Sequence, residues 1–396
     1  MTISLPTGFR AAGVYCRIKR DASKLDLALV VSDRPAVSAG VYTQNLVFAA
    51  PVELDRSRTP CDDIRVVVTN SGNANACTGE RGLSDAREMA RLAAETVGAT
   101  GEQALVMSTG IIGEFLPLEK VKAGIAAAAT QLGSDEKSLI NAARAMLTTD
   151  TREKLAGRTV KLSGHAIQIT GMCKGAAMIG PRMGTMLGLI LTDAKLTPDT
   201  AQAALSAVVE DTFNCISVDG HMSTNDTVLL VANGATGPLL NGADLAAFQT
   251  ALNEVAAELA QAIPADGEGA THLVTIDVSG CADRDAAHKI AKTVAESALV
   301  KCAIAGADPN WGRIVSAAGY AGVPFDPKGV DLYVNGHLLY QRGTPVAFDA
   351  DKVSASIHEN RDTHIDLRFS EGICKVRFWT TDLTAEYVRL NADYHT

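Results

Sequence analysis

The sequence predicts a protein of mixed helices and strands that ends in a separate α/β unit. The chain has 396 residues, which is long enough for two or three packed units. Val-rich runs typical of strands alternate with amphipathic segments as far as about residue 195, and a new α/β pattern begins near Cys281. Aromatic residues make up only 5% of the chain and small residues are frequent, so we expect closely packed helices and sheets.

The first half supplies strands flanked by helices. Its alternating or fully apolar runs predict strands, and its runs of helical periodicity predict amphipathic helices. Residues 186–191 are apolar on both faces, which is typical of a central buried strand. The expected strands are 27–31, 36–43, 64–70, 105–108 and 186–191, with a hairpin over 160–169, and the expected helices are 84–97 and 118–132.

The second half repeats the pattern with longer helices. A Gly/Asn-rich stretch at 233–241 indicates a turn region. Asp308 before Pro309 is typical of an N-cap followed by the first turn of a helix. The expected helices are 198–210, 245–263, 284–299, 309–318 and 385–391, and the expected strands include 227–232 and 300–304.

The composition excludes several classes of partner. A net charge of −9 without any basic run argues against nucleic acid and anionic membranes, because both require clustered Lys and Arg. No apolar stretch approaches the roughly 18 residues that a membrane-spanning helix needs. The N-terminus lacks the pattern of a signal peptide, so we expect a cytoplasmic protein.

The cysteines and histidines show no metal-binding pattern. The eight cysteines form no Cys-x-x-Cys pair, and the eight histidines show no His-x-x-x-His spacing. We therefore expect neither a metal nor another cofactor. Cys173 lies close to the central motif described next, and we favour a buried structural thiol over a reactive one.

A motif near the middle of the chain places Gly184 before Thr185 at the entry to an apolar run. Alone, this pair is typical of a turn that leads into a buried strand. It is also the arrangement of an internal nucleophile. If the peptide bond before Thr185 breaks, the freed α-amine, which titrates near pH ~8, becomes a base on the same residue. The motif runs Lys174-Gly175-Ala176-Ala177-Met178-Ile179-Gly180-Pro181-Arg182-Met183-Gly184-Thr185-Met186-Leu187.

Other motifs supply polar groups. Thr109-Gly110 after an apolar strand offers a hydroxyl and an open backbone N–H, the two donors that an oxyanion needs, although such a pair is also an ordinary strand-to-loop turn. The hydroxyls of Thr148 and Thr149 follow a helix, where caps are common. Glu268 lies between two glycines, as loop carboxylates often do.

Together these motifs resemble those of the ArgJ family, the ornithine acetyltransferases (glutamate N-acetyltransferases) of arginine biosynthesis. The usual family form of the central motif is Lys-Gly-x-Gly-Met-Ile-x-Pro-x-Met-Ala-Thr-Met-Leu. Here Ala177 replaces the second glycine, and Gly184 replaces the alanine before the nucleophile. Residues 219–222 read Asp-Gly-His-Met, where family members commonly have Asp-Gly-Asp-Thr. Further matches lie at 70–79, 223–227 and 306–314.

The resemblance implies an α/β (α+β) fold of the DmpA/ArgJ kind, with antiparallel sheets sandwiched between helices and a smaller C-terminal α/β domain. It implies self-cleavage between Gly184 and Thr185. Residues 1–184 would form the first part of the catalytic domain, 185–280 its second part, and 281–396 a domain whose tail lines the site. The two pieces would form a heterodimer, and two heterodimers would pair.

The resemblance also implies roles for individual residues. Thr185 would be the nucleophile, and Thr109 and Gly110 would form the oxyanion hole. The residues implied to contact substrate are Thr148 (with Thr149 as the alternative), Lys174, Thr185, Glu268, Asn391 and the terminal Thr396.

The implied reaction is a ping-pong transfer of the acetyl group of N2-acetylornithine to glutamate through acetyl-Thr185. Whether acetyl-CoA is a further donor substrate, which would make the enzyme bifunctional, stays open. Two alternatives also stay open: a self-processing amidase or aminopeptidase that uses water as the acceptor, and a homologue that never cleaves.

Overall fold

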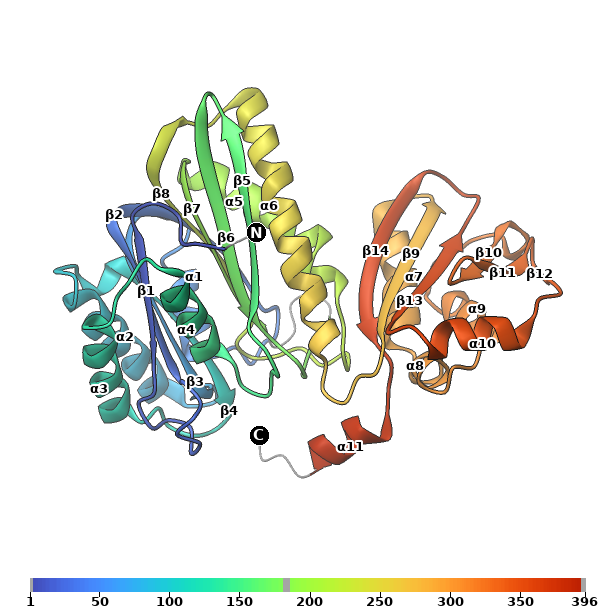
Figure 1. Ribbon diagram of the computed structural model, residues 1–396, viewed down its shortest axis with the longest axis horizontal. Helices are drawn as coiled ribbons and strands as arrows, with labels where there is room; N and C mark the ends of the chain where they lie inside the picture. Colours follow the sequence, from blue (N-terminus) through green and yellow to red (C-terminus); the bar gives the residue numbers. More distant parts are fainter. Residues whose placement is uncertain (1–2, 181–185, 393–396) are drawn as a thin grey trace.

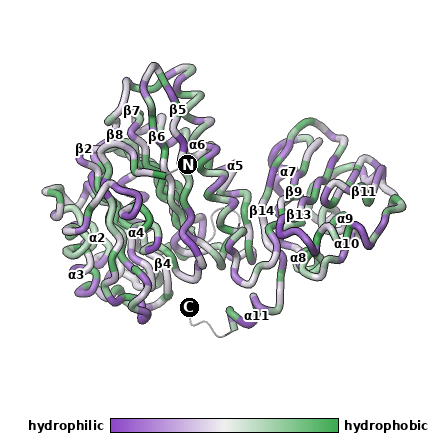
Figure 2. Tube along the Cα trace, in the orientation of Figure 1, coloured by the Kyte–Doolittle hydropathy of each residue, from purple (hydrophilic) through white to green (hydrophobic). Residues whose placement is uncertain are grey.

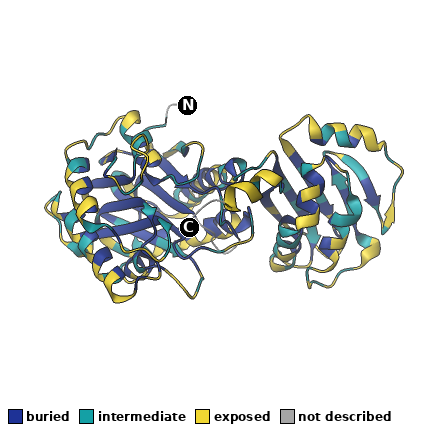
Figure 3. Ribbon diagram, turned by 90° about the horizontal axis from the view of Figure 1, so that it is seen from below, coloured by how far each residue is buried: buried dark blue, intermediate teal, exposed yellow. Residues whose placement is uncertain are grey.

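The computed structural model describes residues 3–180 and 186–392, which form two sheets with separate hydrophobic cores (Figure 1). Buried residues follow the strands of both sheets, and exposed residues lie on the outer helices and loops (Figure 3). Hydrophobic and hydrophilic stretches alternate along the chain in both parts (Figure 2). Among the described residues, no helix is both long and apolar enough to cross a membrane. The expected α/β fold with a smaller second unit is confirmed.

The larger sheet has eight strands in the order β4-β3-β2-β8-β7-β6-β5, with β1 paired to the first half of β2. Most neighbours are antiparallel, as expected, but β3–β4 and β7–β8 run parallel. The strands are β1 Phe9–Val14, β2 Leu27–Tyr42, β3 Cys61–Asn73, β4 Ala104–Ile111, β5 Lys154–Leu162, β6 His165–Lys174, β7 Leu187–Lys195 and β8 Thr227–Leu239.

Helices cover both faces of this sheet. One face packs against α4, and the other packs against α2 and α3 near β4 and against α5 and α6 near β5. Successive residues of β7 therefore point into different cores, which explains why this strand is apolar on both faces. The helices are α1 Ala50–Arg56, α2 Gly79–Glu95, α3 Leu118–Ala129, α4 Glu136–Met146, α5 Pro198–Asp211 and α6 Gly242–Ala262, with 3₁₀ turns at Gly101–Gln103, Phe213–Cys215 and Pro264–Asp266.

The smaller sheet has the order β12-β11-β10-β13-β9-β14, and β9 and β13 are parallel. Its inner face packs against α7 to α10, whereas polar residues such as Asp277 and Arg377 lie on the outer face. The elements are β9 Leu273–Cys281, α7 Arg284–Glu296, α8 Ala298–Ala305, α9 Trp311–Gly319, a 3₁₀ turn Pro327–Gly329, β10 Asp331–Val334, β11 His337–Gln341, β12 Thr344–Pro345, α10 Ala350–His358, β13 Asp362–Arg368, β14 Cys374–Thr381 and α11 Ala385–Ala392.

Several expected elements need correction. Residues 300–304 lie in helix α8 and not in a strand, because a short run of mostly apolar residues fits either element. The turn region expected at 233–241 is mostly strand, since β8 continues to Leu239 through Gly234 and Gly237, both with positive φ. Helix α9 begins at Trp311 with Asn310 as its N-cap, in place of Asp308.

The smaller sheet already begins at Leu273, ahead of the boundary expected at residue 281. The expected division between residues 184 and 185 falls outside the described ranges and stays a prediction.

Candidate active site

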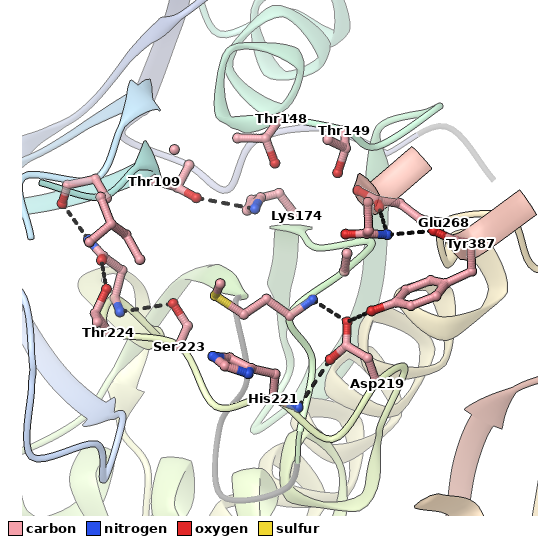
Figure 4. A pocket seen from close by; sticks show the side chains of 17 residues that line it. Thr109, Thr148, Thr149, Lys174, Asp219, His221, Ser223, Thr224, Glu268 and Tyr387 are labelled. Carbon is pink, nitrogen blue, oxygen red and sulfur yellow. Dashed lines mark hydrogen bonds between the residues drawn. The ribbon is translucent and has the colours of Figure 1, made fainter. Parts of the chain in front are cut away.

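A pocket of about 360 Å³ lies where the ends of β4 and β6 meet the segments that connect the two sheets. Six of the residues singled out in the sequence line it: Thr109, Gly110, Thr148, Lys174, Glu268 and Asn391. Thr149, the alternative to Thr148, lines it as well. Gly184, Thr185 and Thr396 lie outside the described residues. The sequence motifs from both halves of the chain therefore converge on one cavity (Figure 4).

Thr109 and Gly110 end β4 at the pocket wall. Gly110 has a φ of 135°, and a Cβ at this position would lie 2.3 Å from the carbonyl carbon of Gly72 on β3. Only glycine fits such a close approach of two strands. The preceding residue Thr109 is 1% exposed and directs its hydroxyl toward Lys174 (Figure 4).

Lys174 is a buried cation at the end of β6. Its Nζ donates a hydrogen bond to Thr109 Oγ1 at 3.2 Å, and among the described residues it forms no ion pair. Burial lowers the pKa of Lys174, while the nearby carboxylate of Asp150 opposes this effect. A buried ammonium without a bonded carboxylate is a strong binding group for a ligand that supplies one.

Beneath the pocket lies a second buried lysine, Lys154, in a fully paired environment. Its Nζ lies 2.6 Å from Asp150 Oδ1 and 2.6 Å from Asp266 Oδ2. Asp150 also accepts the N–H groups of Thr148 at 3.0 Å and Gly175 at 2.7 Å. This ion triad, Asp150–Lys154–Asp266, ties the Thr148 loop to the end of β6 and to the turn before Glu268.

The ion triad shifts the pKa values of its members. Burial would raise the pKa of Asp150, but Lys154 and Lys174 outweigh it and hold this pKa at about 2. Burial would lower the pKa of Lys154, and its two carboxylates raise it instead. Asp150 and Lys154 therefore remain charged at neutral pH.

Asp219 and His221 lie on the loop before β8, and sequence reasoning assigned neither a role. Asp219 accepts the N–H groups of Met178 at 2.6 Å and Ile179 at 2.9 Å, and the hydroxyl of Tyr387 at 3.1 Å. It thus fixes the segment that leads toward residue 181. His221 lines the pocket.

Glu268 and Asn391 close the pocket from the side of the smaller sheet. Asn391 Nδ2 donates to Glu268 Oε2 at 2.9 Å, and Glu268 N donates to Ala176 O at 2.9 Å. Helix α11, which carries Asn391 and Tyr387, follows β14 and returns to the larger sheet (Figure 1). The smaller sheet therefore contributes to the site through its two connecting segments.

The chemistry of the lining suits a small zwitterion. Lys174 can bind a carboxylate, Glu268 can bind an ammonium group, and Thr109 with Gly110 presents donors for a carbonyl oxygen. Within the described ranges, no group of three His, Cys, Asp or Glu side chains could hold a metal ion. Cys173 is buried, and burial raises the pKa of its thiol to about 12, in accord with a structural role.

Comparison with known proteins places this arrangement in a family. The sequence profile of the ArgJ family matches residues 10–396. Two relatives, both named arginine biosynthesis bifunctional protein ArgJ, come from Rhodopirellula baltica and Symbiobacterium thermophilum. The first is 50% identical and covers 99% of this chain and 96% of the relative; the second is 45% identical and covers 100% and 98%. A crystal structure of the protein of that name from Bacillus halodurans is 38% identical over 52% of this chain and 98% of the solved chain, with a TM-score of 0.51.

Proposed function

This chain belongs to the ArgJ family, and from that premise we propose that it is an acyltransferase of arginine biosynthesis. It transfers the acetyl group of N2-acetylornithine to glutamate. The observation that carries the proposal is the convergence of Thr109, Gly110, Lys174, Glu268 and Asn391 on one pocket. These groups match the needs of acetyl transfer between amino acids: an oxyanion hole, a cation and a carboxylate.

The first step proposed is self-cleavage. Thr185 Oγ attacks the carbonyl carbon of Gly184, the C–N bond breaks, and the hydroxyl proton passes to the leaving nitrogen. Water then hydrolyses the ester, which leaves a carboxyl group on Gly184 and a free α-amine on Thr185. One observation supports this step. Lys174 and Leu187 pair in neighbouring strands, so the segment between them starts and ends beside the pocket.

The second step is the acetyl transfer. The α-amine of Thr185 accepts the hydroxyl proton while Oγ attacks the acetyl carbonyl of N2-acetylornithine. The Thr109 hydroxyl and the Gly110 N–H stabilise the oxyanion. Ornithine leaves with the proton, and the amine of glutamate then attacks acetyl-Thr185, which regenerates the nucleophile.

The remaining groups bind the substrates. Lys174 binds the substrate carboxylate, and Glu268, held by Asn391, faces the ammonium end. Thr148 and the terminal Thr396 complete the site. We further propose that the two pieces stay together as a heterodimer, that heterodimers pair, and that the enzyme acts in the cytoplasm without metal or cofactor.

The intact mass of the purified protein tests this function. We expect two pieces split before Thr185, and the later piece gains one acetyl group on incubation with N2-acetylornithine. Added glutamate then removes the acetyl group and forms N-acetylglutamate. Thr185→Ala stays uncut, whereas the control Thr250→Ala, on the outer side of α6, behaves as wild type. An uncut wild type would overturn the mechanism, and loss of the acetyl group to water alone would identify an amidase.

A further inference from the structure

Two cysteines lie opposite each other at one end of the smaller sheet. Cys281 is the last residue of β9 and Cys374 is the first residue of β14, and the two are register partners in this antiparallel pair (Figure 1). Both are free thiols. Elsewhere in the described strands, no two cysteines are register partners. The pairing of β9 with β14 therefore brings two thiols together at a defined place.

A β-bulge puts both side chains on the inner face of the sheet. The pairing with β14 passes from Ser279 directly to Cys281, so Gly280 is the extra residue on β9, and its φ of 77° suits a glycine. Ser279 lies on the outer face, and the extra residue turns Cys281 into the core, where it is 3% exposed. Cys374 lies two positions before the core residue Val376 and so shares the inner face.

The spacing of such partners suits a disulfide bond. Residues directly opposite in an antiparallel pair have Cα atoms roughly 4.5–5.5 Å apart. A disulfide forms without strain where the Cα atoms are about 4.4–6.8 Å apart. Rotation of the two side chains is therefore enough to join Cys281 to Cys374, and the strands need not move.

The two thiols differ in their access to solvent. Cys374 is partly exposed and follows the fully exposed Ile373. Burial raises the pKa of the Cys281 thiol to about 11. The neighbours Glu371, Asp283 and Cys374 raise it further. Because the thiolate is the attacking form, Cys374 is the thiol that meets a reagent from solvent, and Cys281 is the thiol that resolves the product.

We propose that Cys281 and Cys374 form a reversible oxidation site that a low-molecular-weight disulfide, such as oxidised glutathione, closes. The Cys374 thiolate attacks one sulfur of the reagent, the S–S bond of the reagent breaks, and one reduced thiol leaves. Cys281 then loses its proton, its sulfur attacks the sulfur of Cys374, and the second reduced thiol leaves. The protein loses two hydrogen atoms, and the reagent gains them. In a reducing compartment such a bond is transient and forms under oxidising conditions.

The bond closes a ring around most of the smaller unit. The chain from Cys281 to Cys374 contains α7 to α10 and β10 to β13, so the link constrains this unit when it unfolds. Both cysteines lie at the end of the strand pair opposite to Leu273 and Thr381, where the chain connects to the pocket. We therefore expect oxidation to stabilise the smaller unit and to leave acetyl transfer unchanged.

Peptide mapping and intact mass test the site with oxidised glutathione as the probe. The parent is the full chain with three accessible cysteines replaced: Cys61→Ser, Cys77→Ser and Cys302→Ser. We expect the loss of two hydrogen atoms and a linked pair of peptides that contain Cys281 and Cys374, both reversed by dithiothreitol. Thermal unfolding of the oxidised protein should have a midpoint roughly 5 °C higher. Both cysteines follow residue 185, so the test reads the same whether or not the chain is cut.

Single variants of this parent separate the proposed bond from general thiol oxidation. Cys281→Ser removes the resolving thiol, so we expect the reaction to stop with one glutathione on Cys374. Cys374→Ser should take up no glutathione at Cys281, because the remaining thiol is buried. The control Cys215→Ser removes another buried thiol of the same core and should still form the bond.

Three outcomes overturn the site. The first is a parent that keeps both thiols, and the second is one that stops at the mixed disulfide with glutathione. The third is a bond that maps to any other pair of cysteines. If a single variant does not fold, the map of the parent decides alone. A bond that leaves the thermal midpoint unchanged would overturn the stabilising effect.

Discussion

Two buried lysines on neighbouring strands, Lys154 below the pocket and Lys174 in its wall, are held in opposite ways. Lys154 lies between the carboxylates of Asp150 and Asp266, whereas the ammonium of Lys174 meets the neutral hydroxyl of Thr109. The pKa of Lys154 is raised and that of Lys174 is lowered. The charge of Lys154 is therefore balanced within the fold, whereas we propose that the charge of Lys174 is balanced by a bound substrate.

The largest effect on stability should come from the ion triad, Asp150–Lys154–Asp266. Lys154→Met leaves two buried carboxylates without their cation, so we expect a loss of about 3–5 kcal/mol in the free energy of unfolding, measured with urea. Arg158→Met on the same strand removes exposed pairs with Glu254 and Glu258 and should cost no more than about 1 kcal/mol. Equal losses in the two variants would contradict the claim that the buried ion triad stabilises the fold more than the exposed pairs do.

Lys174→Met should lower the activity and leave the stability of the fold unchanged. We expect kcat/KM for N2-acetylornithine to fall roughly 10²–10³-fold, because a preorganised charge in a desolvated site is lost. The midpoint of thermal unfolding should not fall, since removing an unpaired buried cation also removes its desolvation cost. Lys195→Met, at the exposed end of β7, is the control and should change neither quantity. A variant that keeps wild-type transfer would exclude Lys174 from substrate binding.

Asp226, which lies directly before β8, extends the comparison to a buried acid. Burial raises its pKa to about 8, above the ordinary value near 4, so between pH 4 and 8 the folded state binds more protons than the unfolded state. The stability that this proton contributes is complete below pH 4 and is lost as pH rises toward 8, by at most roughly 1.4 kcal/mol per pH unit. Urea titrations across this range should show a flatter curve for Asp226→Asn; parallel curves would contradict the raised pKa.

The smallest effect concerns the contact across the pocket. Asn391→Ala removes the hydrogen bond to Glu268, worth about 1 kcal/mol, so we expect KM for N2-acetylornithine to rise roughly fivefold with kcat unchanged. Arg389→Ala breaks only the exposed ion pair with Glu386 on the same helix and should leave KM unchanged. The two KM values measured side by side decide whether α11 contributes a binding group or only covers the pocket.

The sequence predicted the fold class and several of the residues that line the pocket, because these residues lie in continuous motifs. Thr109-Gly110 and Glu268 are examples, and their resemblance to family motifs was specific. Partnerships between distant residues were not predictable. The Lys154–Asp266 bond joins residues 112 positions apart, and no local sequence pattern predicts it. The same holds for Tyr387 and Asp219, which are 168 positions apart.

The elements that the sequence predicted wrongly are explained by their surroundings in the fold. Apart from Lys301, residues 300–304 are apolar and partly β-branched, which favours a strand. They lie in α8 because packing against the inner face of the smaller sheet outweighs this propensity. The glycines of β8 are equally typical of turns and of irregular strand pairing, and only the neighbouring strand β7, where the register shifts, decides between them.

The strand order of the larger sheet has a consequence for how the protein is made. Strands β7 and β8 follow the proposed cut, yet they are inserted between β2 and β6, which precede it. Each fragment synthesised by itself would expose long unpaired edges, the feature that promotes aggregation. We therefore expect that the sheet assembles before the cut is made, and that two separately produced fragments recover activity only when they are co-expressed or refolded together.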